Sequence, residues 1–143
     1  MKISQRGIDF IKQWEKYKSK PYDDGYGTMT IGYGHAIQEG EDWESLTEEE
    51  AYVLLLSDIA VAEGDIAKLV KVRLNQNQYD AVVSFFYNVG ATKIAASTET
   101  LPDLNAGRFD EFADDLLSWR KSGGKISRGL IRRRAAEREL FLS

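Results

Sequence analysis

Two carboxyl groups near the N-terminus have the residue types and surroundings of an acid and base pair. Glu15 lies between Trp14 and Tyr17, and these aromatic neighbours would raise the pKa of its carboxyl group and keep it protonated. Asp24 lies in a polar turn beside Gly25, where its carboxylate would stay ionised. A protonated acid and an ionised carboxylate together suit hydrolysis of a glycosidic bond. The chain has 23 acidic residues, however, so a pair at this spacing is also common by chance.

The segment that carries Asp24 has the composition of a small antiparallel sheet. Residues 17–37 are rich in Gly, Tyr and Thr, and contain Pro21 and glycines at positions 25, 27, 32 and 34. Clusters of this kind favour short strands joined by tight turns. Before this segment, apolar residues at positions 3, 8, 11 and 14 predict a helix over about 4–14. Glu15 is therefore expected at the end of a helix and Asp24 at the mouth of a hairpin.

The remainder of the chain predicts helices only. A capping box at residues 47–50 opens a long helix that Gly64 is expected to end. Asn75 is expected to cap a second helix, whose apolar stripe runs to Gly90. Three further helices are expected, at about 98–105, at about 108–119 and, after the glycines at 123 and 124, at about 127–142.

This order of elements predicts an α+β fold with its strands segregated in one place. The 143 residues fit a single domain, residues 1–143. Its small strand-containing lobe would cover about 15–60, and its helical lobe about 65–143 plus the N-terminal helix. A cleft is expected between the lobes, because ligand sites favour such junctions. Glu15 and Asp24 are expected to line that cleft.

The segment 14–35 resembles the catalytic region of the phage-type lysozymes, glycoside hydrolase family 24. The family pattern is Glu, eight residues, Asp, five residues, Thr, and then Ile-Gly-x-Gly-His. Glu15, Asp24 and Thr30 have this spacing, and residues 31–35 supply the tail. Further similarity at residues 55–58, 76–90 and 119–138 extends the resemblance over nearly the full chain.

The resemblance implies a mainly helical lysozyme-like fold and an endolysin, or muramidase, active in host cell lysis. Such an enzyme hydrolyses the β-1,4 bond between N-acetylmuramic acid and N-acetylglucosamine in bacterial peptidoglycan. Inversion at the sugar carbon is implied, with Glu15 as the general acid. Asp24 would be the general base, or electrostatic partner, of the attacking water. Thr30 would position that water on the opposite face of the sugar.

Other positions carry expectations about binding and structure. Gly34, Tyr87 and Asn88 are expected to contact the substrate. His35 is expected to be structural, because the acid and base roles are already filled, and the resemblance pairs it with Asp58. An ion pair of this kind would raise the pKa of His35 and lower that of Asp58.

The composition excludes several classes of site. The chain has no cysteine and one histidine, so disulfides and multi-histidine or thiolate metal sites are excluded, and neither a metal nor a cofactor is expected. No segment resembles a signal peptide or reaches the roughly 20 apolar residues of a membrane span. The protein is therefore expected to start in the host cytoplasm and to reach the wall after membrane disruption. A holin is the partner suggested for that step. The protein is also expected to be a monomer.

Charge is unevenly distributed along the chain. Residues 1–118 carry 11 basic and 21 acidic side chains, whereas residues 119–143 carry eight basic and two acidic ones. A basic end on an acidic body suggests an anionic partner. The arginines at 132–134 are expected to form mainly a solvated helix face, with arginines also packing against nearby acidic side chains. Attraction to the anionic cell wall is the alternative. Nucleic acid is not the expected partner, because the chain is acidic overall and carries no motif that reads it.

Two other functions stay open as alternatives. A lytic transglycosylase cleaves the same bond with one acid and leaves an anhydro sugar, so the presence of Asp24 and Thr30 argues against it. A non-catalytic cell-wall-binding protein should have lost one of the three matching positions, and none is lost.

Overall fold

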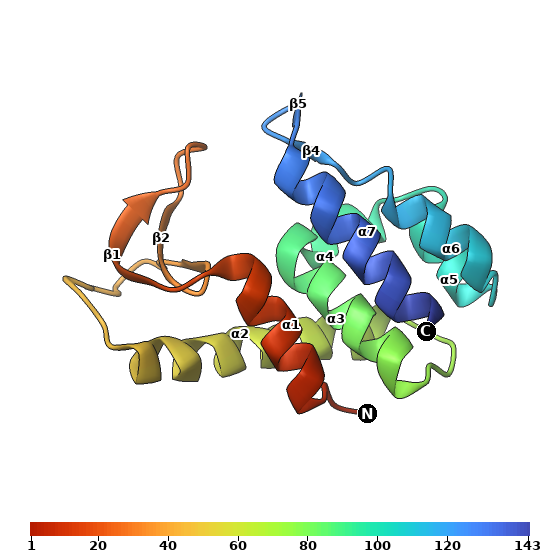
Figure 1. Ribbon diagram of the computed structural model, residues 1–143, viewed down its shortest axis with the longest axis horizontal. Helices are drawn as coiled ribbons and strands as arrows, with labels where there is room; N and C mark the ends of the chain where they lie inside the picture. Colours follow the sequence, from red (N-terminus) through yellow and green to blue (C-terminus); the bar gives the residue numbers. More distant parts are fainter.

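The computed structural model describes residues 1–143 and has the predicted α+β architecture (Figure 1). A three-stranded sheet lies between the first two helices in the sequence, and all the later long elements are helices. The elements are α1 (Gln5–Glu15), β1 (Lys18–Asp23), β2 (Met29–Gly32), β3 (His35–Ala36), α2 (Glu48–Leu69), α3 (Gln76–Val89), α4 (Ala91–Ala95), α5 (Thr100–Asn105), α6 (Phe109–Leu116), β4 (Lys121–Ser122), β5 (Lys125–Ile126) and α7 (Arg128–Leu142).

Polar side chains fix the starts of the four longest helices. The Ser4 side chain accepts a hydrogen bond from the backbone N–H of Gly7 at the start of α1, and Ser127 caps α7 in the same way. Thr47 and Asn75 each form a complete capping box, at α2 and α3. These bonds satisfy backbone donors that a helix leaves free in its first turn, so the helix starts are encoded locally.

The sheet is antiparallel throughout, in the order β1-β2-β3. Thr30 lies opposite Tyr22 of β1 and Ala36 of β3. The register of β1 and β2 shifts between Lys18 and Tyr22, which marks a bulge. The turn that carries Asp24 joins β1 to β2 at one end of this sheet.

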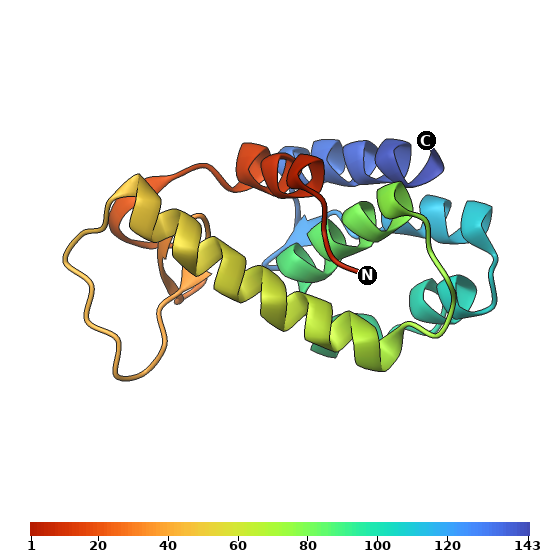
Figure 2. The same ribbon diagram turned by 90° about the horizontal axis from the view of Figure 1, so that it is seen from below.

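Helix α2 connects the two parts of the molecule. Figure 1 shows the three-stranded sheet beside one end of α2, and Figure 2 shows α2 crossing the molecule toward the other helices. Its residues contact β2 and β3 as well as α3 and α4. The prediction that Gly64 ends this helix is wrong, because α2 continues to Leu69. A glycine inside a helix costs only about 1 kcal/mol, and burial of Ala62 and Ile66 on either side offsets that cost.

The segment before α7 contains structure that the sequence pattern did not predict. Gly123 and Gly124 have φ values of 58° and 80°, and they form the turn of a short hairpin between β4 and β5. Two residues with positive φ suit a tight hairpin turn, so these glycines join strands rather than only ending a helix. Helix α4 was also not predicted, since it has five residues and no side-chain cap.

All seven helices contribute apolar side chains to the core, which extends to Ile31 and Tyr33 of the sheet segment. Phe85, Phe112 and Phe141 form its aromatic centre, with ring centroids 4.9–6.3 Å apart along the series. No helix has the combination of length and apolarity needed to cross a bilayer.

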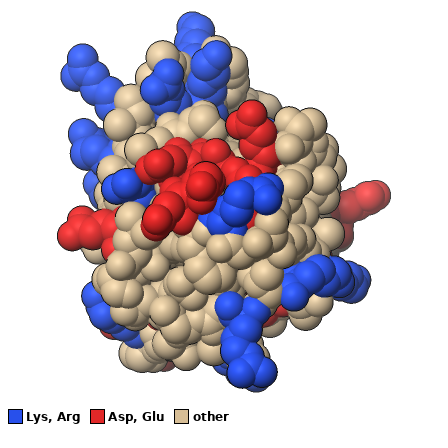
Figure 3. Space-filling view, turned by 90° about the vertical axis from the view of Figure 1, so that its right-hand side faces the viewer, with Lys and Arg blue, Asp and Glu red and all other residues tan.

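Acidic side chains gather on the end of the molecule formed by α5 and α6 (Figure 3). Within this group, burial raises the pKa of Asp115 to about 7, and the neighbouring carboxylate of Asp103 adds to the effect. Arg108 pairs with Asp103 at 2.8 Å, and Arg138 of α7 pairs with Asp114 at 3.0 Å. Arg138 of the basic C-terminal segment is therefore paired within the protein.

Candidate active site

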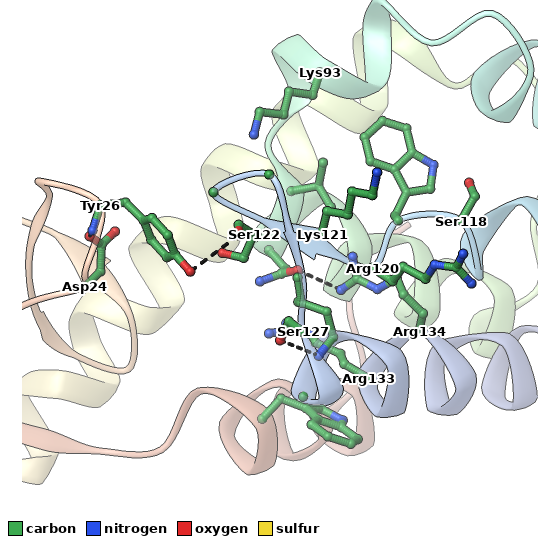
Figure 4. Close-up of a pocket in the computed structure, with 18 of the residues that line it drawn as sticks. Asp24, Tyr26, Lys93, Ser118, Arg120, Lys121, Ser122, Ser127, Arg133 and Arg134 are labelled. Atoms are coloured by element: carbon green, nitrogen blue, oxygen red, sulfur yellow. Dashed lines mark hydrogen bonds between the residues drawn. The ribbon is translucent and has the colours of Figure 1, made fainter.

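A cavity of about 990 Å³ lies where the turn after β1 faces the helices, and both Glu15 and Asp24 line it (Figure 4). Trp14 and Glu15 come from the end of α1, and Asp24 and Tyr26 from the turn between β1 and β2. The opposite wall is formed mainly by residues 118–124 and by the first turns of α7. The two carboxyl groups singled out from the sequence therefore share one cavity.

Glu15 is held by a buried arginine that the sequence did not reveal. Its Oε2 lies 2.5 Å from Nη1 of Arg133, and the two side chains are 16% and 5% exposed. On its other side, a Cβ placed on Gly34 would lie 2.5 Å from Glu15 Oε1. Gly34 also has a φ of 77°, a conformation that favours glycine. The carboxyl group is thus fixed between a guanidinium group and a glycine, not in the purely apolar setting expected.

The expectation that residues 132–134 form a solvated helix face is wrong for two of the three arginines, which instead pack against acidic side chains as the other part of that expectation has it. Arg133 and Arg134 are buried, at 4% and 0% exposure, and only Arg132 is exposed. Both contact Glu137, which is itself fully buried. Burial lowers the pKa of Arg134 to about 10, while the charge of Glu137 acts in the opposite direction. Carboxylates on α1 and α7 replace the solvent that these arginines would otherwise require.

Asp24 is oriented by the backbone of its own turn. Its Oδ1 accepts hydrogen bonds from the N–H groups of Tyr26, at 2.7 Å, and Thr28, at 3.2 Å. The backbone N–H of Asp24 donates to the carbonyl oxygen of Thr28 at 3.0 Å. Its Oδ2 has no partner within the protein, so one exposed carboxylate oxygen is free for water or a ligand.

Thr30 lies one residue into β2 and does not line the cavity. It is 6% exposed, and its hydroxyl donates to the carbonyl oxygen of Thr28 at 3.3 Å. Thr28 in turn donates to Asp24, so one residue connects Thr30 with Asp24. The role of Thr30 in placing water stays a prediction.

Tyr26 forms a bridge between the two walls, and the sequence analysis did not single it out. Its ring packs against Gly123, where there is no room for a Cβ, and its hydroxyl lies 3.5 Å from the carbonyl oxygen of Ser122 (Figure 4). The ring is nonetheless 61% exposed. The turn after β1 and the turn between β4 and β5 therefore touch across the cavity.

The two residues expected as sugar contacts at the end of α3 point in different directions. Asn88 lines the cavity, and its Oδ1 accepts a hydrogen bond from Arg134 Nη2 at 2.8 Å. The hydroxyl of Tyr87 donates to the carbonyl oxygen of Tyr33 at 2.7 Å, and burial raises the pKa of this phenol. Tyr87 lines a separate cavity of about 450 Å³ together with Gly34 and His35. Tyr87 therefore does not line the cavity that holds Glu15 and Asp24, and its hydroxyl anchors the sheet segment to α3. Its contact with substrate stays a prediction.

His35 contacts Asp58, as the resemblance implies, and also contacts a second carboxylate. Nδ1 lies 2.7 Å from Asp58 Oδ2, and Nε2 lies 3.0 Å from Glu41 Oε1. Burial lowers the pKa of His35, but hydrogen bonds with Asp58 and Glu41 outweigh it, so the pKa is raised. This side chain connects β3, α2 and the loop that contains Glu41.

Known sequences similar to this chain are phage lysozymes and endolysins. The family model described as phage lysozyme matches residues 12–137. An endolysin of Bacillus phage B103 is 44% identical over the whole chain, which spans 55% of that relative. An endolysin of Salmonella phage P22 is 42% identical and is covered to 99%. The chain thus spans about half of the Bacillus phage relatives, whereas it spans nearly the whole P22 protein.

Solved structures share the fold of this chain over nearly its full length. An endolysin from Escherichia coli O157:H7 phage FAHEc1 superposes with a TM-score of 0.88 at 34% identity, covering 100% of this chain and 94% of that one. The muramidase domain of SpmX from Asticaccaulis excentricus also gives a TM-score of 0.88, at 35% identity, with coverage of 99% and 98%. The match to the family model, the identity with these relatives and the fold shared over nearly the full length show that this chain belongs to the phage lysozyme family.

Proposed function

We propose that this chain is a muramidase domain of an endolysin, which hydrolyses the glycan strands of bacterial peptidoglycan. The observation that carries the proposal is the presence of Glu15 and Asp24 on one cavity large enough for sugar units. Family membership and the names of the relatives, endolysins and a muramidase domain, support the same substrate.

In the proposed reaction, Glu15 donates a proton to the oxygen of the bond that breaks. Arg133 contacts Oε2, so Oε1 is the oxygen available to carry that proton. Asp24 assists attack by water on the opposite face of the sugar, through the carboxylate oxygen that has no protein partner. This assignment makes the reaction inverting, because water rather than a carboxylate forms the new bond to the sugar carbon. Thr30 is proposed to help position the water if its hydroxyl turns away from Thr28.

The test compares Glu15→Gln with wild type and with Glu139→Gln, a change on the exposed part of α7. Clearing of outer-membrane-permeabilised cells is the activity readout. The amide keeps the shape of Glu15 but cannot donate the proton, so we expect a loss of roughly 10²–10⁴-fold, with Glu139→Gln unaffected. Thermal unfolding is followed in parallel, because the amide removes the carboxylate of Glu15 from Arg133. A folded Glu15→Gln protein that clears cells at the wild-type rate would contradict the assignment.

Analysis of the products separates hydrolysis from lytic transglycosylation. Hydrolysis adds water and leaves a reducing N-acetylmuramic acid end, whereas a transglycosylase leaves an anhydro ring. We expect reducing ends only, initially as the α anomer that inversion of a β bond produces. Anhydro products would overturn the role of Asp24.

A further inference from the structure

A fully buried carboxyl group, Glu137, lies behind the proposed active site. Its Oε2 accepts hydrogen bonds from Ser84 Oγ, at 2.6 Å, and from Arg134 Nη2, at 3.2 Å, and its Oε1 lies 2.7 Å from Arg134 Nε. No part of Glu137 reaches the cavity or the solvent. Burying a carboxylate is costly unless cations and hydrogen-bond donors surround it, and all of those present here come from α3 and α7.

Arg133 connects Glu137 with Glu15. Its guanidinium group directs Nε to Glu137, at 3.3 Å, and Nη1 to Glu15, at 2.5 Å. Its Nη2 lies 3.3 Å from both the carbonyl oxygen and the hydroxyl of Ser84. Because each side of the planar group has a partner and the side chain is 5% exposed, Arg133 has little freedom to turn away from Glu15.

When Glu15 is ionised, the four groups form a balanced set, with Arg133 and Arg134 against Glu15 and Glu137. The other ionisable groups on the cavity are Asp24, Tyr26, Lys93, Arg120 and Lys121, and the phenols of Tyr22 and Tyr87 also interact with Glu15. If Glu137 lost its charge, two buried guanidinium groups would face Glu15 alone. Positive potential favours the ionised form of a carboxyl group, so Glu15 would then release its proton more readily.

We propose that Glu137 is a positioning residue for the active site, which holds Arg133 against Glu15 and balances its charge so that Glu15 can retain a proton. This inference rests on the proposed role of Glu15 as the general acid. Burial raises the pKa of Glu137 itself, whereas the charges of Arg134 and Arg133 act in the opposite direction. Burial is the larger of these effects, and the two guanidinium contacts favour the ionised form of the buried carboxyl group.

The experiment uses two readouts on the same variants. The first is the pKa of the Glu15 carboxyl group, followed by carbon-13 NMR. The second is the alkaline limb of the pH–activity profile. Glu137→Gln should lower the pKa of Glu15 and the pH of the alkaline limb by about one unit. That is the size of the interaction between two unit charges on opposite sides of one guanidinium group, at an effective dielectric constant of about 20. Glu139→Gln, an exposed change on the same helix, should shift neither.

Arg134→Gln should shift both readouts in the opposite direction. It also keeps the proposal testable if Glu137→Gln does not fold. Removing this positive charge should raise the pKa of Glu15 and move the alkaline limb to higher pH. The double variant Arg134→Gln with Glu137→Gln restores neutrality, so its profile should return toward wild type. A merely structural role would lower activity in all three variants without these opposed shifts.

The two readouts also separate this inference from the proposed function. If neither the pKa of Glu15 nor the alkaline limb moves in Glu137→Gln and Arg134→Gln, the inference is overturned. If the pKa of Glu15 shifts as expected while the alkaline limb stays in place, the coupling through Arg133 stands. In that case it is the assignment of Glu15 as the general acid that fails.

Discussion

Replacing Asp58 by asparagine should remove a pH-dependent part of the stability of this protein. In wild type both ring nitrogens of His35 face carboxylates, Asp58 at 2.7 Å and Glu41 at 3.0 Å. Only protonated histidine can donate from both nitrogens at once. The variant keeps the shape of Asp58 but replaces a charge-assisted hydrogen bond with a neutral one.

The expected loss can be estimated from the burial of the pair. The side chain of His35 is 10% exposed and that of Asp58 is 29% exposed, so the bond is only partly screened by solvent. A hydrogen bond between charged groups in such a site is worth about 2 kcal/mol. The entropy of unfolding for a chain of 143 residues is about 0.3 kcal/mol/K, so Tm should fall by about 6–7 °C at pH 5.

The sign of the pH dependence follows from the raised pKa of His35. Its contribution to stability is fully present below about pH 6.5, the unfolded pKa, and is lost as pH rises through the higher folded pKa. The backbone N–H of Gln38 lowers the pKa of Glu41, and the bond to His35 adds to this. The contribution of Glu41 is therefore present above about pH 4.5 and is lost as pH falls through its lowered pKa. Together the two groups predict maximum stability between about pH 4.5 and 6.5.

Thermal unfolding of wild type, Asp58→Asn and Asp65→Asn from pH 4.5 to 9 provides the assay. Asp65 lies on the same helix and lines the same cavity but has no ion pair, so its variant should follow the wild-type profile. The difference in Tm between wild type and Asp58→Asn should shrink toward alkaline pH, because neutral His35 has only one N–H group to donate. The only histidine in the chain also gives one NMR titration. A constant difference at every pH, or a His35 pKa that is not raised, would refute the reasoning.

Three further outcomes are expected. Gly34→Ala should lower activity at least ten-fold, because its Cβ would displace Glu15. Gly90→Ala is the control: Gly90 has a similar φ but no atom near the position of its Cβ, so activity should stay intact. If the hydroxyl of Thr30 places the water, Thr30→Ser should keep most of the cell-clearing rate and Thr30→Val should lose it. Equal rates in the two variants would mean that Thr30 serves only in packing. Asp115→Asn should raise Tm more at pH 8 than at pH 5, because the cost of ionising Asp115 begins above its unfolded pKa of 3.8 and is complete only above its folded pKa of about 7. Equal effects at both pH values would contradict this.

Local sequence patterns determined much of the fold. The caps at Thr47 and Asn75 placed the starts of α2 and α3, because the bonds that begin a helix involve residues three apart. The glycine-rich segment after Glu15 predicted the sheet for a similar reason, since the conformation of a turn depends on the residues within it. The spacing of Glu15, Asp24 and Thr30 identified the candidate site before any contact was known.

Only the tertiary structure decided the surroundings of those residues. Arg133 is 118 positions from Glu15 along the chain, and nothing in the sequence around either residue distinguishes a buried arginine from a solvated one. The direction of Tyr87 and the contact of Tyr26 with Gly123 were likewise set by packing between distant segments. Helix and turn preferences arise from bonds between near neighbours, whereas the charge and orientation of a buried group depend on which distant side chains replace its water.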